Sequence, residues 1–161
     1  MTIHHYKSPI GILEIKTDGK VITGLDILKN IPAVLQTSAN PLIKEVCKQL
    51  DEYFAGKRKV FDLPLAPEGT PFQQTAWKQL QEIPYGQTIS YSQEAKAIGH
   101  PKACRAVGSA NGKNPIAIII PCHRVVAANG GLGGYASGLK NKIKLLELEK
   151  SVMTGSLLHP Q

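Results

Sequence analysis

A cysteine followed directly by a histidine and an arginine, at residues 122–124, is the part of the sequence best suited to chemistry. A thiol becomes a strong nucleophile only when it loses its proton, and a nearby imidazole or cation favours that loss. Neighbours in sequence need not bring their side chains together, and a free cysteine is more often a small buried apolar residue. Cys122 is therefore a candidate nucleophile with a structural alternative.

The other cysteines indicate the environment of the chain. The sequence contains 3 cysteines, which are Cys47, Cys104 and Cys122, and they form no CxxC pair. No histidine cluster has zinc-ligand spacing, so we expect no metal ion. The odd count and the lack of a signal peptide favour free thiols in a reducing compartment, the cytoplasm, or the nucleus of a eukaryote. The apolar run 116–120 is far too short to cross a membrane, and none is expected as a partner.

The elements around Cys122 can be predicted from local patterns. The apolar run 116–120 is typical of a buried strand that ends just before the cysteine. A glycine-rich loop follows over 129–138, and a final helix begins near Leu139. We expect this helix to bury Leu139, Ile143 and Leu146 and to turn Lys140, Lys142 and Lys144 to its other faces.

Three helices are expected before this region. Capping boxes at Thr70/Gln73 and Ser90/Gln93 predict helix starts, and the second helix extends to about Ile98. A further helix is expected from Pro101 to about Ala110. Together with the helix that ends near Ile98, it has the pattern of a helix-turn-helix. Most helical hairpins serve structural purposes, and the pattern alone leaves DNA binding as one of two interpretations.

The first part of the chain has a different pattern. Strand-like runs at 12–16 and 21–27 flank Asp18-Gly19, a hairpin signal, and a helix capped by Asn40 follows from Pro41. Prolines and a glycine gather between Asp62 and Pro71, which indicates a linker. We therefore predict an N-terminal α+β scaffold domain at 1–66 and a second domain at 67–161.

The charge is uneven between these two parts. The chain has a net charge of +7, with 9 basic and 7 acidic residues in 1–66 (+2) and 10 basic and 5 acidic residues in the remainder (+5). A basic excess in one part suits a polyanion such as nucleic acid, although an inert basic surface would give the same count.

Several spaced motifs together resemble one known family, the O6-alkylguanine-DNA alkyltransferases. The run 121–126 (PCHRVV) looks like the family's active-site signature, with Asn114-Pro115 before it and Gly134-Tyr135 after it. The segment from Tyr91 through 102–108 and the final Leu145-Leu146-x-x-Glu149 also match. The resemblance extends from about Pro71 to Lys150 and fades toward the N-terminus.

The resemblance implies a fold and a reaction. The fold would be α+β, with a small ribonuclease H-like α/β domain followed by a mainly helical, winged helix-turn-helix-like domain. The protein would be a methylated-DNA–[protein]-cysteine S-methyltransferase that moves the alkyl group from O6-alkylguanine onto Cys122, with O4-alkylthymine left open as a second candidate substrate. Because water does not cleave the resulting thioether, each molecule would act once, as a suicide enzyme, without a cofactor.

The resemblance also implies roles for particular residues. His123 would take the proton of Cys122 through a water molecule while Glu149 orients the imidazole. Asn114 would brace the active-site turn, and the hydroxyl of Tyr91 would assist the departing guanine. Besides Tyr91, the expected base-pocket residues are Val125, Tyr135 and Ala136.

Double-stranded DNA containing alkylated guanine is the partner that the resemblance implies, bound by a protein that is monomeric in solution. The target base would be flipped out of the duplex, with Arg105 filling the gap. Cys104 departs modestly from the small apolar residue usual in the family. The expected DNA-binding set is Ser92, Lys102, Ala103, Cys104, Arg105, Gly108 and Lys113.

Two other classes of function are compatible with parts of the sequence. A cysteine hydrolase would use Cys122 and His123 but turn over repeatedly, and it would leave the basic helix pair unexplained. A damage-sensing DNA-binding protein without transfer activity would need no cysteine at position 122.

Overall fold

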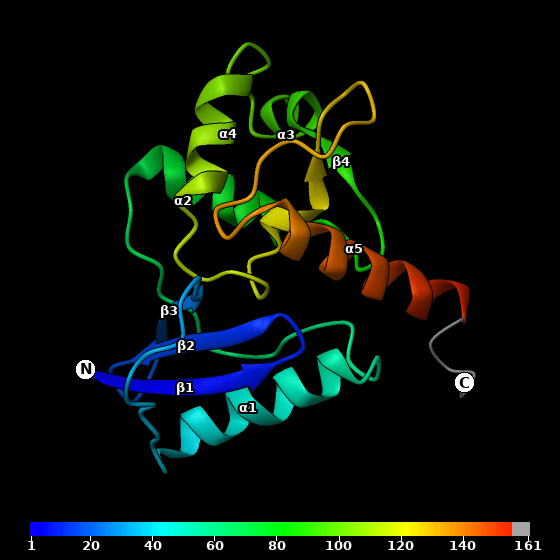
Figure 1. Ribbon diagram of the computed structural model, residues 1–161. Coiled ribbons are helices and arrows are strands. Elements are labelled where there is room, and N and C mark those ends of the chain that lie inside the picture. The colour runs from blue at the N-terminus through cyan, green and yellow to red at the C-terminus, as the bar shows by residue number, and fades with distance from the viewer. Residues whose placement is uncertain (156–161) are drawn as a thin grey trace. The chain divides into compact units, whose positions relative to one another are not determined.

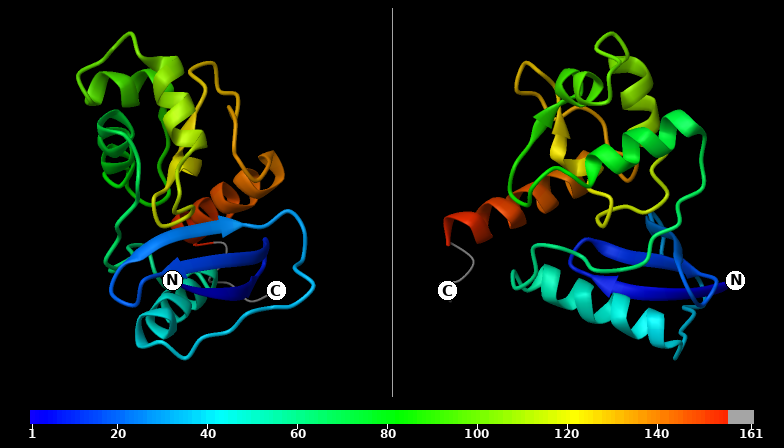
Figure 2. Two further views of the ribbon diagram at one scale, coloured as in Figure 1. Left: turned by 90° about the vertical axis from the view of Figure 1, so that its left-hand side faces the viewer. Right: turned by 180° about the vertical axis from the view of Figure 1, so that it is seen from behind.

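A computed structural model describes residues 1–155, and its chain divides into two compact units. The first unit comprises Met1–Glu68 together with Pro115–Ala117, and the second comprises the described parts of Gly69–Asn114 and Ile118–Gln161. Figures 1 and 2 show strands in the first unit and mostly helices in the second. The predicted α+β class is therefore confirmed.

A three-stranded antiparallel sheet forms the first unit, in the order β1 (Thr2–Ser8), β2 (Gly11–Thr17) and β3 (Ile22–Ile27). The predicted hairpin is present: β2 pairs with β3, and the Asp18 carboxylate accepts from the backbone N–H groups of Lys20 and Val21 at 2.8 and 2.9 Å. Strand β1 was missing from the prediction. Its side chains alternate poorly between buried and exposed, so it lacks the pattern that marked β2 and β3.

Helix α1 (Pro41–Phe54) covers one face of this sheet (Figures 1 and 2). It begins as the sequence predicts, because the Asn40 side chain accepts from the backbone N–H groups of Leu42 and Ile43. Fully buried side chains from the sheet and the helix make the core, among them Leu13, Ile15, Leu25, Val46, Leu50 and Tyr53.

The run 116–120 is not the buried strand that its composition predicts. Only Ile116 makes an isolated bridge, to Leu25 of β3, where Leu25 N–H donates to Pro115 O and Ala117 N–H donates to Leu25 O, both at 2.9 Å. The chain then turns, and Ile118 has a φ of +70°. The run is apolar because its side chains are buried, and periodicity alone cannot distinguish a buried turn from a buried strand.

Three helices precede Cys122 in the second unit: α2 (Pro71–Leu80), α3 (Tyr91–Ala97) and α4 (Cys104–Gly112). Both predicted capping boxes are present, at Thr70/Gln73 and at Ser90/Gln93. Helix α4 begins at Cys104 rather than at Pro101, because residues 101–103 form the turn after α3. Trp77 Nε1 donates to Ala110 O at 2.8 Å and joins α2 to α4.

The remaining elements enclose the region of Cys122. A single 3-10 turn, η1 (Cys122–Arg124), leads into β5 (Val125–Val126), which pairs in parallel with β4 (Ile89–Ser90). A loop then leads to the final helix α5 (Leu139–Thr154). None of the described helices combines the length and apolar character needed to cross a membrane.

The predicted buried face of α5 is wrong. Leu139 and Ile143 are exposed, with 45% and 37% of their surface accessible, whereas Lys142 is fully buried. The buried side chains of this helix are Lys142, Leu145, Glu149 and Val152. Two of these four are charged, so a face chosen by apolar residues alone was rotated away from the true one.

Candidate active site

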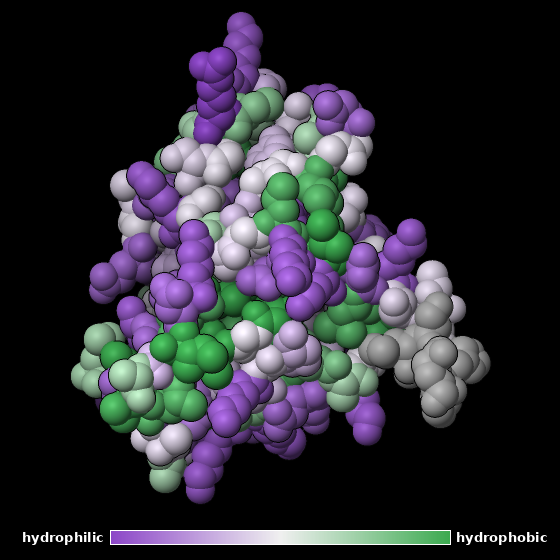
Figure 3. Space-filling view, viewed as in Figure 1, coloured by the Kyte–Doolittle hydropathy of each residue, from purple (hydrophilic) through white to green (hydrophobic). Residues whose placement is uncertain are grey.

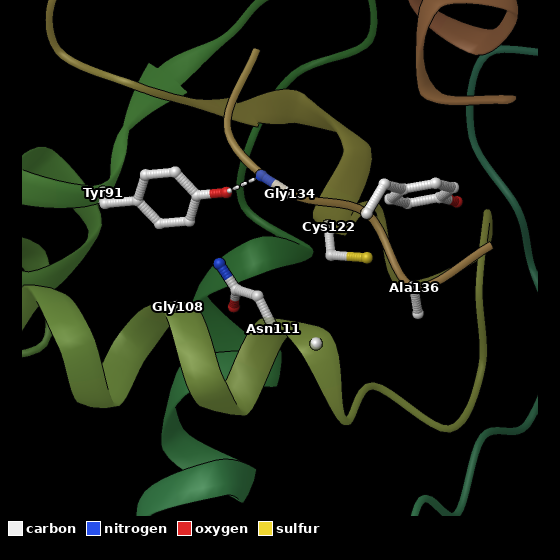
Figure 4. A pocket seen from close by; sticks show the side chains of 8 residues that line it. Tyr91, Gly108, Asn111, Cys122, Gly134 and Ala136 are labelled. Atoms are coloured by element: carbon white, nitrogen blue, oxygen red, sulfur yellow. Dashed lines mark hydrogen bonds between the residues drawn. The ribbon is translucent and has the colours of Figure 1, made fainter. Parts of the chain in front are cut away.

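A cavity of about 360 Å³ opens beside Cys122 within the second unit (Figure 4). Helices α3 and α4, the turn η1 and the loop before α5 each contribute to its wall. The lining residues are Tyr91, Gly108, Asn111, Gly112, Cys122, Gly134, Tyr135 and Ala136. Four of these, Cys122, Tyr91, Tyr135 and Ala136, are among the predicted catalytic and base-binding residues.

Backbone geometry fixes the turn that carries Cys122. The N–H of Cys122 and the side-chain amide of Asn114 both donate to Ile120 O at 2.8 Å. Just upstream, Ile118 holds a φ of +70°, a conformation that a β-branched residue rarely adopts and that costs about 1–3 kcal/mol. Burial of Ile118 and Ile120 offsets this strain. The hydrogen bond from Asn114 to Ile120 O places the Asn114 side chain where it braces the turn.

Behind the cysteine, Glu149 binds both residues that follow it. His123 Nε2 lies 2.7 Å from Glu149 Oε2, and the Arg124 guanidinium donates to both carboxylate oxygens at 2.8 and 3.1 Å. Arg124 also donates to Ile83 O at 2.8 Å. All three side chains are buried. Because the carboxylate has a cation on one side, it remains an acceptor for the imidazole on the other.

The protonation states in this group follow from its surroundings. Burial raises the pKa of Glu149, but the hydrogen bonds of His123 and Arg124 and the positive charge of Arg124 outweigh it and hold that pKa far below its usual value. Burial lowers the pKa of His123 despite the contrary effect of Glu149, so the imidazole is neutral near pH 7. With Nε2 directed at Glu149, the buried Nδ1 has no hydrogen-bond partner among the described residues and is left as the proton acceptor.

Cys122 itself is held as a thiol. Burial raises its pKa to about 11, and the Glu94 carboxylate adds to the increase, while Asn114 and Lys142 act in the opposite direction. A nucleophilic Cys122 therefore needs a base to remove its proton when it reacts, because its thiolate is scarce at neutral pH.

Tyr91 lies across the cavity from Cys122, and its hydroxyl accepts from Gly134 N–H at 3.3 Å (Figure 4). The neighbouring Gly133 has a φ of +71°, and a Cβ there would lie 2.5 Å from the Tyr91 hydroxyl. Only glycine fits this approach. Burial raises the pKa of Tyr91, so the phenol keeps its proton and can donate it to a molecule in the cavity.

Several residues of the site escaped the sequence-based prediction, among them Lys142, Arg124 and Asn111. Lys142 Nζ donates to Val125 O at 2.7 Å and to Gly134 O at 3.0 Å, and so ties β5 to the loop. Arg124 binds Glu149, and Asn111 lines the cavity. Arg124 could have been predicted as a site residue because it directly follows Cys122-His123 in the sequence. No local sequence feature distinguishes Lys142 from its exposed neighbours.

The predicted DNA-binding residues lie on α3, on α4 and at the turns beside them. Arg105, Ser92, Lys102 and Lys113 are exposed. Ala103 caps α4, and Cys104 Sγ lies 3.6 Å from Ser92 Oγ. Gly108 lines the cavity and faces Tyr91, where a Cβ in place of its hydrogen would lie 3.8 Å from the ring, an ordinary contact distance. Val125, which we expected in the base pocket, is fully buried and is not among the residues that line the cavity.

Within residues 1–155, no group of three or more His, Cys, Asp or Glu side chains could hold a metal ion.

The chain combines a helical unit, in which Cys122 lines a cavity, with a small sheet unit. Residues 71–151 match the model of the DNA binding domain of 6-O-methylguanine DNA methyltransferase, and residues 1–67 match its ribonuclease-like domain. The chain belongs to the 6-O-methylguanine DNA methyltransferase family.

Individual relatives agree with this assignment over nearly the whole chain. The methylated-DNA–protein-cysteine methyltransferase of Methanosarcina acetivorans is 49% identical over 150 residues, covering 91% of this chain and 96% of its own. That of Mycobacterium tuberculosis is 49% identical over 153 residues, covering 91% and 93%. The crystal structure of Mycobacterium tuberculosis OGT in complex with DNA superposes with a TM-score of 0.86 at 46% identity, covering 98% and 99%.

Proposed function

We propose that this protein repairs DNA by direct reversal, as a methylated-DNA–[protein]-cysteine S-methyltransferase that moves the alkyl group of O6-alkylguanine onto Cys122. The observation that carries the proposal is the Cys122 thiol in a cavity of about 360 Å³, with a neutral His123 next to it in the chain. That volume is within the range of roughly 300–1,000 Å³ usual for small-molecule sites, so an extruded base has room.

The reaction is a single displacement. His123 Nδ1 accepts the proton of the Cys122 thiol through water, and Glu149 stabilises the imidazolium that forms. The sulfur then attacks the alkyl carbon, a C–S bond forms, and the C–O6 bond breaks with its electron pair passing to the guanine. A proton shared from the Tyr91 hydroxyl neutralises the departing base, and His123 returns the thiol's proton to the phenol.

The products explain why the reaction stops after one turnover. The guanine is restored, and Cys122 becomes a thioether that water does not cleave. None of these steps calls on a cofactor, because the acid, the base and the nucleophile are all side chains of the chain.

The DNA partner suits the outer surface of the helical unit. We propose that α3 and α4 bind the duplex, with Lys102 and Lys113 on phosphates and Arg105 in the gap left by the flipped base. The small residues Ala103, Cys104 and Gly108 permit a close approach, and Ser92 extends the contact. The proposed division is a scaffold domain at 1–66 and a DNA-binding and alkyl-transfer domain at 67–161.

The setting of this activity is also part of the proposal. A monomer in the cytoplasm fits the free cysteines, of which there are three in the described residues, and the archaeal and bacterial relatives. Lesions at O4 of thymine are a second substrate class for the same displacement.

The alternatives have less support. A sensor without transfer activity has no use for a nucleophile in the cavity, and a hydrolase leaves the exposed basic residues of the helix pair without a role. The relatives that match nearly the whole chain are named as methyltransferases.

The test is intact mass after incubation with a duplex that carries one O6-methylguanine. We expect every active chain to gain a single methyl group, located on Cys122 by peptide analysis, with no further turnover when more substrate is added. Cys122→Ser should abolish the gain but still bind the duplex, while Cys47→Ser, which changes a half-buried thiol of the other unit, should react normally. Repeated turnover, or binding without methylation, would contradict the proposal.

A further inference from the structure

A buried acid lies behind the wall of the Cys122 cavity and has no part in the reaction as proposed. Asn111 of α4 lines the cavity with only 7% of its surface exposed, and its Nδ2 donates to Oε1 of Glu94 at 2.7 Å. Glu94, on α3, is fully buried. Figure 4 shows the Asn111 side chain on the same side of the cavity as Tyr91 and Gly108.

The other two oxygens of this pair are unsatisfied. Glu94 Oε2 and Asn111 Oδ1 are both buried, and neither has a hydrogen-bond partner among residues 1–155. A carboxylate can only accept hydrogen bonds, so an ionised Glu94 would leave its own Oε2 and Asn111 Oδ1 without a donor. A protonated carboxyl has one O–H to donate and the amide oxygen can accept it, so the neutral acid is the form complementary to Asn111.

In the described part of the chain, no cation near Glu94 compensates for a negative charge. The other charged residues of α3 and of the helices packed against it are all exposed: Lys78 on α2, Lys96 on α3 and Arg105 on α4. Strands β4 and β5 contain none. Burial accordingly raises the pKa of Glu94 to about 7, although the hydrogen bond from Asn111 acts to lower it.

The titratable groups that do face Glu94 are part of the reaction centre. A charged Glu94 raises the pKa of Cys122 from η1 and that of Tyr91 from its own helix. Ionisation of Glu94 therefore opposes formation of the thiolate.

We propose that Glu94 is a positioning residue of the alkyl-transfer site: as a neutral acid it orients the Asn111 amide in the cavity wall, and as a carboxylate it suppresses the Cys122 thiolate. The inference rests on the proposed function for its meaning in repair, but its first test needs no DNA. It assigns to α3 a role in tuning the nucleophile beyond any contact with the duplex.

The first test measures how fast Cys122 of the full-length chain reacts with iodoacetamide, resolved from Cys47 and Cys104 by peptide mass analysis. Glu94→Gln keeps the shape and the hydrogen-bond acceptor but cannot ionise. At about pH 6, where Glu94 is mostly neutral, the variant and the wild type should react equally; at about pH 8.5 the variant should react about threefold to tenfold faster. Glu82→Gln makes the same change at an exposed residue of this unit and should follow the wild type.

Two results would overturn the proposal. One is a Glu94→Gln profile parallel to that of the wild type at both pH values, which would mean that the charge does not act on Cys122. The other is a uniform loss of reactivity at every pH, which is the expectation for a purely structural side chain. Thermal unfolding of each variant shows whether it is folded in the assay.

The second test addresses the orientation of Asn111. Glu94→Leu removes the charge and the hydrogen bond together, so it should match Glu94→Gln in the iodoacetamide assay but methylate more slowly than Glu94→Gln at about pH 6 with O6-methylguanine duplex. Equal methylation by the two variants would refute the orienting role. If even the wild type fails to accept a methyl group, the proposed function fails, while the iodoacetamide profile still decides whether Glu94 controls the thiol.

Discussion

A buried carboxylate shared by two basic side chains is what organises the residues around Cys122. Glu149 holds His123 by one nitrogen and Arg124 by two, so the imidazole cannot rotate and its second nitrogen is left for the thiol. Burying such charges is costly unless they are paired and bonded, and here each has its partner. The Arg124 guanidinium also lies 5.5 Å from the centre of the Tyr85 ring.

Removing the charge of Glu149 should therefore destabilise the protein strongly. Glu149→Gln leaves Arg124 buried without a counter-charge, and we expect a loss of about 3–5 kcal/mol in the free energy of unfolding. Urea denaturation at neutral pH measures it, with the exposed Glu147→Gln as the matched control. A loss equal to that of the control would show that the pair contributes no stability.

The same change should depend on pH in a stated direction. Because the folded state lowers the pKa of Glu149 below its ordinary value of 4.5, its stabilisation is fully present above that value and is lost as the pH falls below it. The difference in the free energy of unfolding between the wild type and Glu149→Gln should therefore become smaller in acid.

Sequence motifs identified five residues that the site uses or adjoins: Cys122, His123, Glu149, Asn114 and Tyr91. The structure brings Cys122 and Tyr91 to one cavity and pairs His123 with Glu149. Their catalytic roles stay predictions until the variants are measured. The pairing of Glu94 with Asn111 could not be predicted, because it joins two helices through side chains that each resemble ordinary surface residues in sequence.

At the level of the elements, local signals predicted what local contacts determine. Both capping boxes and the Asn40 cap form as expected, since their partners lie three residues away or fewer. The strand predicted at 116–120 does not form, because a strand needs a hydrogen-bonded partner along its length and only Ile116 has one. The predicted buried face of α5 is wrong because Lys142 is buried while its ammonium group donates to the carbonyl groups of Val125 and Gly134. No helical pattern in the sequence can reveal these partners.

Lys142 is the element-scale feature that we expect to matter most for reactivity. It ties β5 to the loop whose residues Gly134, Tyr135 and Ala136 line the cavity. Lys142→Met keeps an unbranched side chain only one atom shorter but leaves two carbonyls without their donor, at a cost of about 1–3 kcal/mol each. Hydrogen exchange over residues 127–138 should accelerate by about tenfold or more, and methylation of Cys122 should slow.

The matched control for this experiment lies on the same helix. Lys140 is exposed, so Lys140→Met removes an equal charge without touching the loop. Exchange that is unchanged in Lys142→Met, or changed equally in both variants, would show that the loop is held by other contacts.

Over the whole molecule, the net charge of +7 is the property that DNA senses first. Figure 3 shows hydrophilic side chains over much of the visible surface, including those that project around the α3–α4 turn. Counterion release makes such binding weaker as salt increases, whatever the base sequence. The net charge predicts that DNA binding weakens with salt, and the structure shows which charged side chains are exposed.

Salt titration of duplex binding should therefore distinguish the two units. The affinity of the wild type for undamaged duplex should fall linearly on a double-logarithmic plot, and Lys102→Gln should reduce the slope by about 1. Lys20→Gln, which removes an exposed charge from the turn between β2 and β3, should leave the slope unchanged. A shallower slope for Lys20→Gln instead would place the duplex on the sheet-bearing unit.

The short return of the chain at Pro115–Ala117 has a practical consequence for protein engineering. These residues hydrogen-bond to Leu25 although the proline-rich segment near residue 67 separates them in the gene. A chimera that exchanges N-terminal halves between relatives at that segment would inherit β3 from one parent and its backbone partner from the other. Recombination designs should move the tripeptide with the sheet it joins, since Cys122 follows only a few positions later and its turn begins where that tripeptide ends.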